Sequence, residues 1–237
     1  MPTGGEELVR ALERLSVEVA FGLPGVHNLA AWKAFPGSGV RLVGVRHEQT
    51  AGYAADGYAR ASGRLGVALT TTGPGAANVV AATGEAWASH TPLLVIATDI
   101  PTAARRHGTY RGTLHETTDQ ASFFRPVTKA CLRVDSADDL ADAVLRAGRL
   151  AMTAPRRPVY LEVPTDLLSA SCAPSDAAPS DAARPTPPRR RPRRRSRPAS
   201  RPPRWPCWPR PRDRWSGPGE VRRRPGPGSS SRPSPAG

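Results

Sequence analysis

Short apolar runs alternate with helix-like segments along the first two thirds of the chain. Five runs predict buried strands, at residues 17–23, 40–47, 65–72, 92–100 and 157–164. The spacing of apolar residues between them predicts helices at 28–35, 48–63, 75–90 and 136–152. Strands that are apolar throughout and alternate with helices are typical of a mostly parallel sheet covered on both faces. The pattern therefore predicts an α/β fold, an open, mostly parallel sheet with helices on both faces.

Residues at the ends of these segments support the predicted boundaries. Asn28 stands where a helix N-cap is expected, and Gly63 stands where a helix is expected to end. Ser136 and Asp139 have the spacing of an N-terminal cap. The sequence Gly73-Pro74-Gly75 predicts a turn between the strand at 65–72 and the next helix.

Composition changes abruptly near residue 170. The chain carries 17 basic and 16 acidic residues up to Ala170, but 17 basic and only 4 acidic residues beyond it. The second part also holds 17 of the 27 prolines and contains no Leu, Ile, Phe, Tyr or Met. A segment with so few large apolar side chains cannot bury enough surface to offset the entropy of ordering. We therefore expect one folded domain at 1–168 and a disordered, basic, low-complexity tail at 169–237.

Cysteines and hydropathy narrow the class of protein further. Cys131, Cys172 and Cys207 are far apart and lack the spacing of metal sites or disulfide frameworks. No run approaches the roughly 18 to 20 apolar residues that span a membrane, and the charged N-terminal segment does not resemble a secretory signal. These features predict a soluble, cytoplasmic protein with no membrane partner.

Three predicted loops gather at one edge of the sheet. Glu48 follows the strand at 40–47, the turn at 22–25 follows the first strand, and residues 71–78 follow the third. In open α/β sheets, ligands bind outside the carboxyl ends of the strands. Glu48 has two possible roles on this basis: it binds a ligand, or it only complements the positive end of the helix that follows.

The order of four motifs adds a family resemblance. The motifs are FGLPG at 21–25, RHEQTAGYAADGYAR at 46–60, TTGPGAANVVAATGEAW at 71–87 and SHTPLLVIATD at 89–99. Together they resemble the N-terminal, pyrimidine-binding domain of the thiamine diphosphate enzymes that act on 2-oxo acids, the group of acetolactate synthase and benzoylformate decarboxylase. The resemblance extends from about residue 5 to about residue 168.

The resemblance implies a cofactor site around Glu48. In the family, a glutamate at this position hydrogen-bonds the aminopyrimidine ring of thiamine diphosphate and promotes its activation. A carboxylate needs a fixed position in a water-poor site for such a role, and a strand end supplies that position. The resemblance also places Gly73, Pro74, Gly75 and Asn78 at the cofactor.

The substrate residues implied by the resemblance are Gly25, His90, His115 and Lys129. His90 resembles the benzoylformate decarboxylase branch, in which a histidine faces the substrate and moves protons; the alternative is a histidine favoured by a helix dipole. His115 stands near the place where acetolactate synthases carry a glutamine, whereas residues 123–130, with Lys129, resemble those synthases. Decarboxylase and carboligase chemistry on a 2-oxo acid therefore both stay open.

Members of the family are longer than this sequence. Their third domain carries a Gly-Asp-Gly motif that holds magnesium and the cofactor diphosphate, and this sequence contains no Gly-Asp-Gly. We therefore expect half of an active site, completed by a homo-oligomer or a partner chain, with magnesium only where another chain supplies the diphosphate domain. Activity of the isolated chain is not expected.

Two explanations fit the Arg-rich tail. Its composition is expected when a GC-rich reading frame is translated out of register, and the tail begins near the end of the resemblance. Alternatively, it is a basic arm that neutralises phosphates and stacks tryptophans on bases. The second explanation leads to an alternative function, a non-catalytic scaffold with a nucleic-acid-binding tail.

Overall fold

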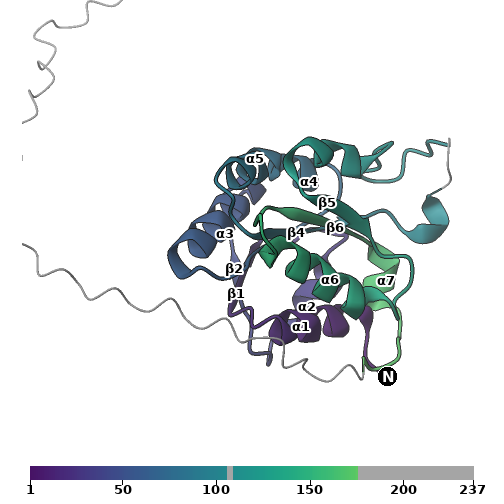
Figure 1. Cartoon of the computed structure of the whole chain (residues 1–237). Helices are drawn as coiled ribbons and strands as arrows, with labels where there is room; N and C mark the ends of the chain where they lie inside the picture. The colour runs from purple at the N-terminus through teal and green to yellow at the C-terminus, as the bar shows by residue number, and fades with distance from the viewer. Residues whose placement is uncertain (106–108, 176–237) are drawn as a thin grey trace, which may run out of the picture. The chain divides into compact units, whose positions relative to one another are not determined.

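The computed structural model describes residues 1–105 and 109–175, which fold around a six-stranded sheet (Figure 1). All strand pairs are parallel, and the strand order is β2-β1-β3-β4-β6-β5. The strands are β1 (Val19–Gly22), β2 (Arg41–Gly44), β3 (Gly66–Thr70), β4 (Leu93–Asp99), β5 (Ala130–Arg133) and β6 (Val159–Pro164). The predicted α/β class with a parallel sheet is confirmed.

The burial of each strand explains why some strands could be predicted from the sequence and one could not. Every residue of β3, β4 and β6 is buried, because these central strands are covered on both faces. They pair in register, with Gly66 opposite Leu93 and Leu94 opposite Val159. The edge strands β2 and β5 are partly exposed. An edge strand needs fewer apolar residues, and β5 was not predicted.

Helices cover both faces of the sheet (Figure 1). One face carries α1 (Gly4–Arg14), α2 (Leu29–Ala34), α6 (Leu140–Met152) and α7 (Thr165–Ser169). The other face carries α3 (Glu48–Ser62), α4 (Pro74–Asn78) and α5 (Val80–Ala88). Short 3₁₀ turns occupy Thr102–Ala104, Gln120–Phe123 and Arg125–Val127. Each face has its own buried apolar cluster, so both faces contribute to the core.

The second face packs through small side chains. Ala51 and Ala55 of α3 are fully buried against the sheet layer. A methyl group added at Gly52 would come within 2.6 Å of Ala82 and 2.7 Å of Val79 on the neighbouring helices. Only glycine permits this close approach, which fixes α3, and with it Glu48 at its first residue, against α4 and α5.

The segment predicted as a turn followed by one helix consists of two helices. Pro74 is the first residue of α4, and Gly73 before it has a φ of 61°. Proline is favoured at a first helical position because its missing N–H would have no partner there. The helix ends at Asn78, and α5 starts at Val80. The prediction of one continuous helix at 75–90 was therefore wrong.

Two of the predicted caps also differ in detail. The side chain of Asn28 makes no helix cap; its Oδ1 accepts from the Gly25 N–H at 2.8 Å, and its Nδ2 donates to the Leu23 carbonyl at 3.0 Å. Asn28 therefore shapes the loop after β1. Ser136 accepts from the Asp139 N–H at 3.2 Å, but α6 begins only at Leu140.

Helices α1 and α7 were not predicted. Helix α1 begins with a capping box between Thr3 and Glu6, inside the charged segment that the sequence analysis used only against a secretory signal. Gly63, in contrast, ends α3 as predicted, in a left-handed conformation with a φ of 74°.

The described structure continues past the predicted domain end at 168. Ser171 forms a β-bridge with Thr3, the Cys172 N–H donates to the Pro2 carbonyl at 3.0 Å, and the Ser175 hydroxyl donates to Glu7 Oε2 at 2.8 Å. The rest of the predicted tail, 176–237, lies outside the described residues. Cys131 and Cys172 are free thiols, and no described helix has the length and apolarity to cross a membrane.

Candidate functional site

The loops after β1, β2 and β3 meet at the carboxyl edge of the sheet. These three strands are neighbours, so their carboxyl ends lie together. A methyl group at Gly25 would lie 2.7 Å from the Thr71 hydroxyl, and one at Gly75 would lie 2.6 Å from the Thr71 methyl carbon and 3.2 Å from Glu48 Oε1. The predicted convergence of the three loops is therefore present in the structure.

Glu48 is the first residue of α3, and it is only 6% exposed. Its Oε2 accepts a hydrogen bond from Asn78 Nδ2 at 2.9 Å. Asn78 is the last residue of α4, so this bond joins the start of α3 to the end of α4. Within residues 1–105 and 109–175, Glu48 forms no ion pair. The neighbouring His47 caps α3 by accepting from the Gln49 N–H at 3.2 Å, which fits a structural role.

Glu48 differs in this respect from the other buried carboxylates of the described residues. Each of the others pairs with an arginine, as expected because an unpaired buried charge is costly. The pairs are Glu7–Arg10, Asp56–Arg60, Asp99–Arg105, Asp99–Arg133 and Glu162–Arg133. At the place where three loops converge, Glu48 is thus buried with no cation from the described part of the chain.

Two more polar atoms at this edge lack a protein partner. Thr71 Oγ1 and His115 Nδ1 are buried, and neither has a hydrogen-bond partner in the part of the chain that the structure describes. The His115 backbone lies so close to Gly73 that a methyl group there would clash with the His115 carbonyl. Buried polar atoms are normally hydrogen-bonded. These two atoms, with the Glu48 carboxylate, give the edge the polar groups needed to bind a ligand.

His27 is a residue of this site that the sequence analysis missed. Its Nδ1 lies 2.8 Å from Thr72 Oγ1, which donates to Thr98 Oγ1 at 3.0 Å, and its ring meets the His115 ring edge-on at 5.9 Å. Burial, followed by the charge of His115, lowers the pKa of His27, so its neutral form is favoured. His27 stands two residues after the GLPG turn, and this position in the sequence could have indicated that it lies at the site.

His90 does not lie with Glu48. It follows α5, has a φ of 53° and is exposed, and its Nε2 is 3.4 Å from an Arg157 side-chain nitrogen. Strand β4 starts only three residues later, at Leu93, so His90 lies at the amino ends of the strands. Because Glu48 follows β2 at the carboxyl edge, the expected place of His90 at the site is corrected.

Lys129 also lies away from the Glu48 edge. It immediately precedes β5, and its ammonium group donates to the carbonyls of Leu150 at 3.1 Å, Thr153 at 2.8 Å and Pro155 at 3.2 Å. These bonds satisfy carbonyls at and after the last turn of α6. The structure therefore gives Lys129 a structural role in place of the expected substrate contact.

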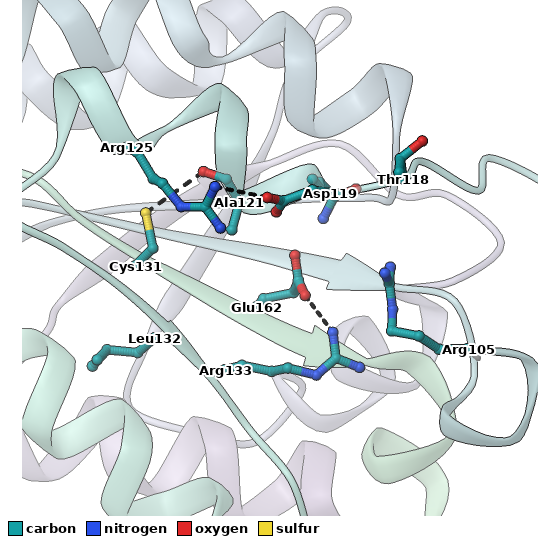
Figure 2. Close-up of a pocket in the computed structure, with 10 residues that line it drawn as sticks. Arg105, Thr118, Asp119, Ala121, Arg125, Cys131, Leu132, Arg133 and Glu162 are labelled. Atoms are coloured by element: carbon teal, nitrogen blue, oxygen red, sulfur yellow. Dashed lines mark hydrogen bonds and ion pairs between the residues drawn. The ribbon is translucent and has the colours of Figure 1, made fainter. Parts of the chain in front are cut away.

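A second polar cluster lies beside β5 and β6, and its members Arg105, Arg133 and Glu162 line a pocket of about 400 Å³ (Figure 2). Asp99 accepts from Arg105 at 2.5 Å and from Arg133 at 2.7 Å, and Arg133 also pairs with Glu162. Although burial raises the pKa of Asp99, the two arginines hold it below its ordinary value. Burial and the nearby Asp99 charge raise the pKa of Glu162.

Comparison with known proteins gives consistent matches. The family described as thiamine pyrophosphate enzyme, N-terminal TPP binding domain, matches residues 2–123. A probable 2-ketoarginine decarboxylase of Pseudomonas aeruginosa is 43% identical over 171 residues, which cover 72% of this chain and 30% of the relative. The acetolactate synthase large subunit of Corynebacterium glutamicum is 35% identical over 71% of this chain and 26% of the relative. The 2-hydroxyacyl-CoA lyase 2 of Danio rerio is 37% identical over 70% of this chain and 26% of the relative. The matched part spans less than a third of the length of these relatives.

Proposed function

Because this chain belongs to the thiamine pyrophosphate enzyme family, as its N-terminal TPP-binding domain, we propose that the edge around Glu48 binds the pyrimidine half of thiamine diphosphate. Thiamine diphosphate is the cofactor of this domain. The observation that carries the proposal is the Glu48 carboxylate, which is buried, accepts a hydrogen bond from Asn78 and has no cationic partner among the described residues. The partnerless Thr71 hydroxyl beside it is a further polar atom that fits a bound ring.

Each residue of the edge has a role in this proposal. Glu48 accepts a hydrogen bond from the ring and exchanges a proton with it at the carboxylate oxygen. Asn78 fixes the direction of that carboxylate by donating to Oε2. Gly75 lets the loop after β3 approach Glu48, since any side chain there would meet Thr71. Asn78, at the end of α4, contacts Glu48, and the Glu48 side chain is almost fully buried, which limits the access of water.

The proposed chemistry is decarboxylation or carboligation of a 2-oxo acid. Thiamine diphosphate, when bound, accepts the electron pair released as the bond next to a 2-oxo group breaks. Gly25, His115 and His27 are the proposed substrate-side residues, because they lie at the same edge as Glu48. The relatives with printed activities include a decarboxylase, a synthase and a lyase, and they support both reaction types.

The remaining half of the active site is part of the proposal. The chain spans about 30% or less of the length of these relatives. The described residues contain no cluster of side chains that could hold a metal ion, and we propose that a partner chain supplies the groups that hold magnesium and the diphosphate. The comparisons do not favour the alternative of a scaffold with a nucleic-acid-binding tail. We place the protein in the cytoplasm, in line with its cysteine spacing.

Saturation-transfer NMR with thiamine diphosphate tests the proposal on the full chain. We expect transfer to the pyrimidine protons of the cofactor that exceeds transfer to its thiazolium protons, because the site proposed on the described residues contacts the pyrimidine half. The substitution Glu48→Gln should reduce the pyrimidine signal. Asp56→Asn is the matched control, since Asp56 is buried on the same helix but pairs with Arg60. Equal transfer in the wild type and Glu48→Gln would contradict the proposal.

A further inference from the structure

Gly73 starts the loop that reaches Glu48, and its backbone is held from outside that loop. Its φ of 61° and ψ of −109° lie in a region that other residues rarely adopt. Its N–H donates to Gln120 Oε1 at 2.5 Å. Gln120 belongs to the turn that precedes β5, 47 positions later in the chain, and it is 1% exposed. The bond therefore ties this strained residue to a distant buried side chain.

The neighbours of Gln120 permit only one orientation of its amide. The Nε2 group donates to the Thr98 carbonyl at 2.9 Å and to the Tyr160 hydroxyl at 2.7 Å, while Oε1 faces the Gly73 N–H. The flipped amide would place its NH₂ against the Gly73 N–H and its oxygen against a carbonyl. The bonds to Gly73 and Thr98 would then be lost, so the surroundings direct the acceptor oxygen at Gly73.

Tyr160 and Glu162 fix this orientation in turn. Tyr160 is completely buried, stacks on Phe124 with ring centroids 4.1 Å apart, and donates its hydroxyl proton to Glu162 Oε2 at 3.0 Å. With its proton committed, the hydroxyl can only accept from Gln120. Glu162 is held by Arg133, as the close-up in Figure 2 shows. The chain of contacts runs from the Arg133 cluster to the start of α4.

We propose that Gln120 is a positioning residue, which sets the Gly73 backbone and through it the place of Asn78 and Gly75 beside Glu48. Tyr160 and Glu162 act on the same loop by orienting the Gln120 amide. Gln120 itself touches no reacting atom in this proposal. The positioning of Gly73 is independent of ligand, whereas its consequence for cofactor binding rests on the proposed function.

Scalar coupling across the hydrogen bond tests the contact in the unaltered full chain. In protein labelled with ¹⁵N and ¹³C, we expect a measurable coupling between the Gly73 amide nitrogen and the Gln120 side-chain carbonyl carbon. A Gly73 amide that shows no such coupling and exchanges with solvent as fast as an open loop would overturn the proposal.

Substitution of Gln120 tests the consequence for the loop. Gln120→Met keeps the length of the side chain but removes the acceptor, and we expect the Gly73 amide to exchange with solvent at least about tenfold faster. Amides in the middle of β3 and β4 should keep their protection. Tyr160→Phe keeps the ring stack and should accelerate exchange at Gly73 by a smaller factor. An unchanged Gly73 in folded Gln120→Met would overturn the proposal.

The cofactor readout separates this inference from the proposed function. We expect Gln120→Met to weaken thiamine diphosphate binding about tenfold, which corresponds to about 1.4 kcal/mol. Thr128→Val is the control for the loss of buried hydrogen bonding, because the Thr128 hydroxyl donates to the Phe124 carbonyl at 2.8 Å and contacts Cys131 Sγ at 3.3 Å but lies next to Lys129 before β5. Wild-type binding in Gln120→Met would overturn the positioning role alone. If neither the wild type nor the variants bind the cofactor, the proposed function fails. The rate of solvent exchange at the Gly73 amide then still tests whether Gln120 holds the loop.

Discussion

Two regions at the carboxyl edge of the sheet bury carboxylates in opposite ways. Beside β4, β6 and β5, Asp99 and Glu162 share Arg133, and Arg105 adds a second cation to Asp99. Beside β2 and β3, Glu48 is buried to a similar degree, but its one side-chain partner among the described residues is the neutral amide of Asn78. The paired cluster satisfies its own charges, whereas the Glu48 region leaves a carboxylate for a ligand to complete.

The difference separates a structural use of charge from a functional use. Removing one partner of a buried ion pair leaves an uncompensated charge, so the paired cluster must stay intact for the fold to be stable. Glu48 has no cationic partner among residues 1–105 and 109–175, so its substitution breaks no ion pair in that part of the chain. We expect the burial of its charge to lower the stability of the free protein. Natural sites accept such a cost where a ligand needs the group. The comparison predicts large stability effects in the cluster and small ones at Glu48.

The largest expected effect is the loss of Arg133. Arg133→Met leaves Glu162 without a cation and Asp99 with only Arg105, and we expect the free energy of unfolding to fall by about 3 to 5 kcal/mol. Urea denaturation of the full chain measures this. Arg125→Met is the control, because Arg125 and Asp119 are exposed and their pair contributes less than about 1 kcal/mol. Equal effects of the two substitutions would remove the distinction between buried and surface pairs.

The next largest effect is expected at Gly73. Gly73→Ala places a side chain where φ is 61° and where the His115 carbonyl leaves no space, and we expect a loss of about 1 to 3 kcal/mol. Gly57→Ala is the control, at an exposed position in the interior of α3 where an added methyl group would meet nothing within 4 Å; it should stabilise by about 0.5 to 1 kcal/mol. Thermal unfolding compares the two. A tolerated Gly73→Ala would mean that the loop is not held in this conformation.

A smaller effect is expected from pH at His27. Burial and His115 lower the pKa of folded His27, while Asp99 opposes this shift. The unfolded protein therefore binds more protons than the folded protein at pH values just below the unfolded pKa of about 6.5. The stabilising contribution of neutral His27 is present above that pH and is lost as the pH falls below it. His27→Gln should make the free energy of unfolding less dependent on pH between 7.5 and 5.5, and an unchanged slope would contradict the assignment.

The smallest stability effect is expected at Glu48. Glu48→Gln keeps the size of the side chain and removes a buried charge that no described cation pairs. We expect the free energy of unfolding to change by less than about 1 kcal/mol, and to rise rather than fall. Denaturant titration of Glu48→Gln and Arg133→Met under the same conditions compares their free energies of unfolding. A loss as large as that of Arg133→Met would show that Glu48 has a structural role.

The sequence predicted the sheet because its central strands are apolar throughout. It did not predict β5, whose edge position allows polar residues, or the break at Val79 between α4 and α5. The strand-end argument and the family resemblance predicted a cofactor site at the Glu48 edge and the loop at 73–75, and the site stays a prediction. His90 was misplaced because its motif was interpreted without regard to the end of the strand at which it lies. Gln120 was missed because its partners, Gly73 and Tyr160, are distant in the sequence.

Ligand-induced stabilisation of Glu48→Gln tests the central claim most directly. The free energy of unfolding is measured for the wild type and for Glu48→Gln, each with and without thiamine diphosphate in large excess. Binding to the folded state alone stabilises a protein by about 2.7 kcal/mol at a ligand concentration one hundred times the Kd. We predict a clear gain for the wild type and little or none for Glu48→Gln. An equal gain in both proteins would contradict the claim that the unpaired Glu48 carboxylate is kept for the cofactor.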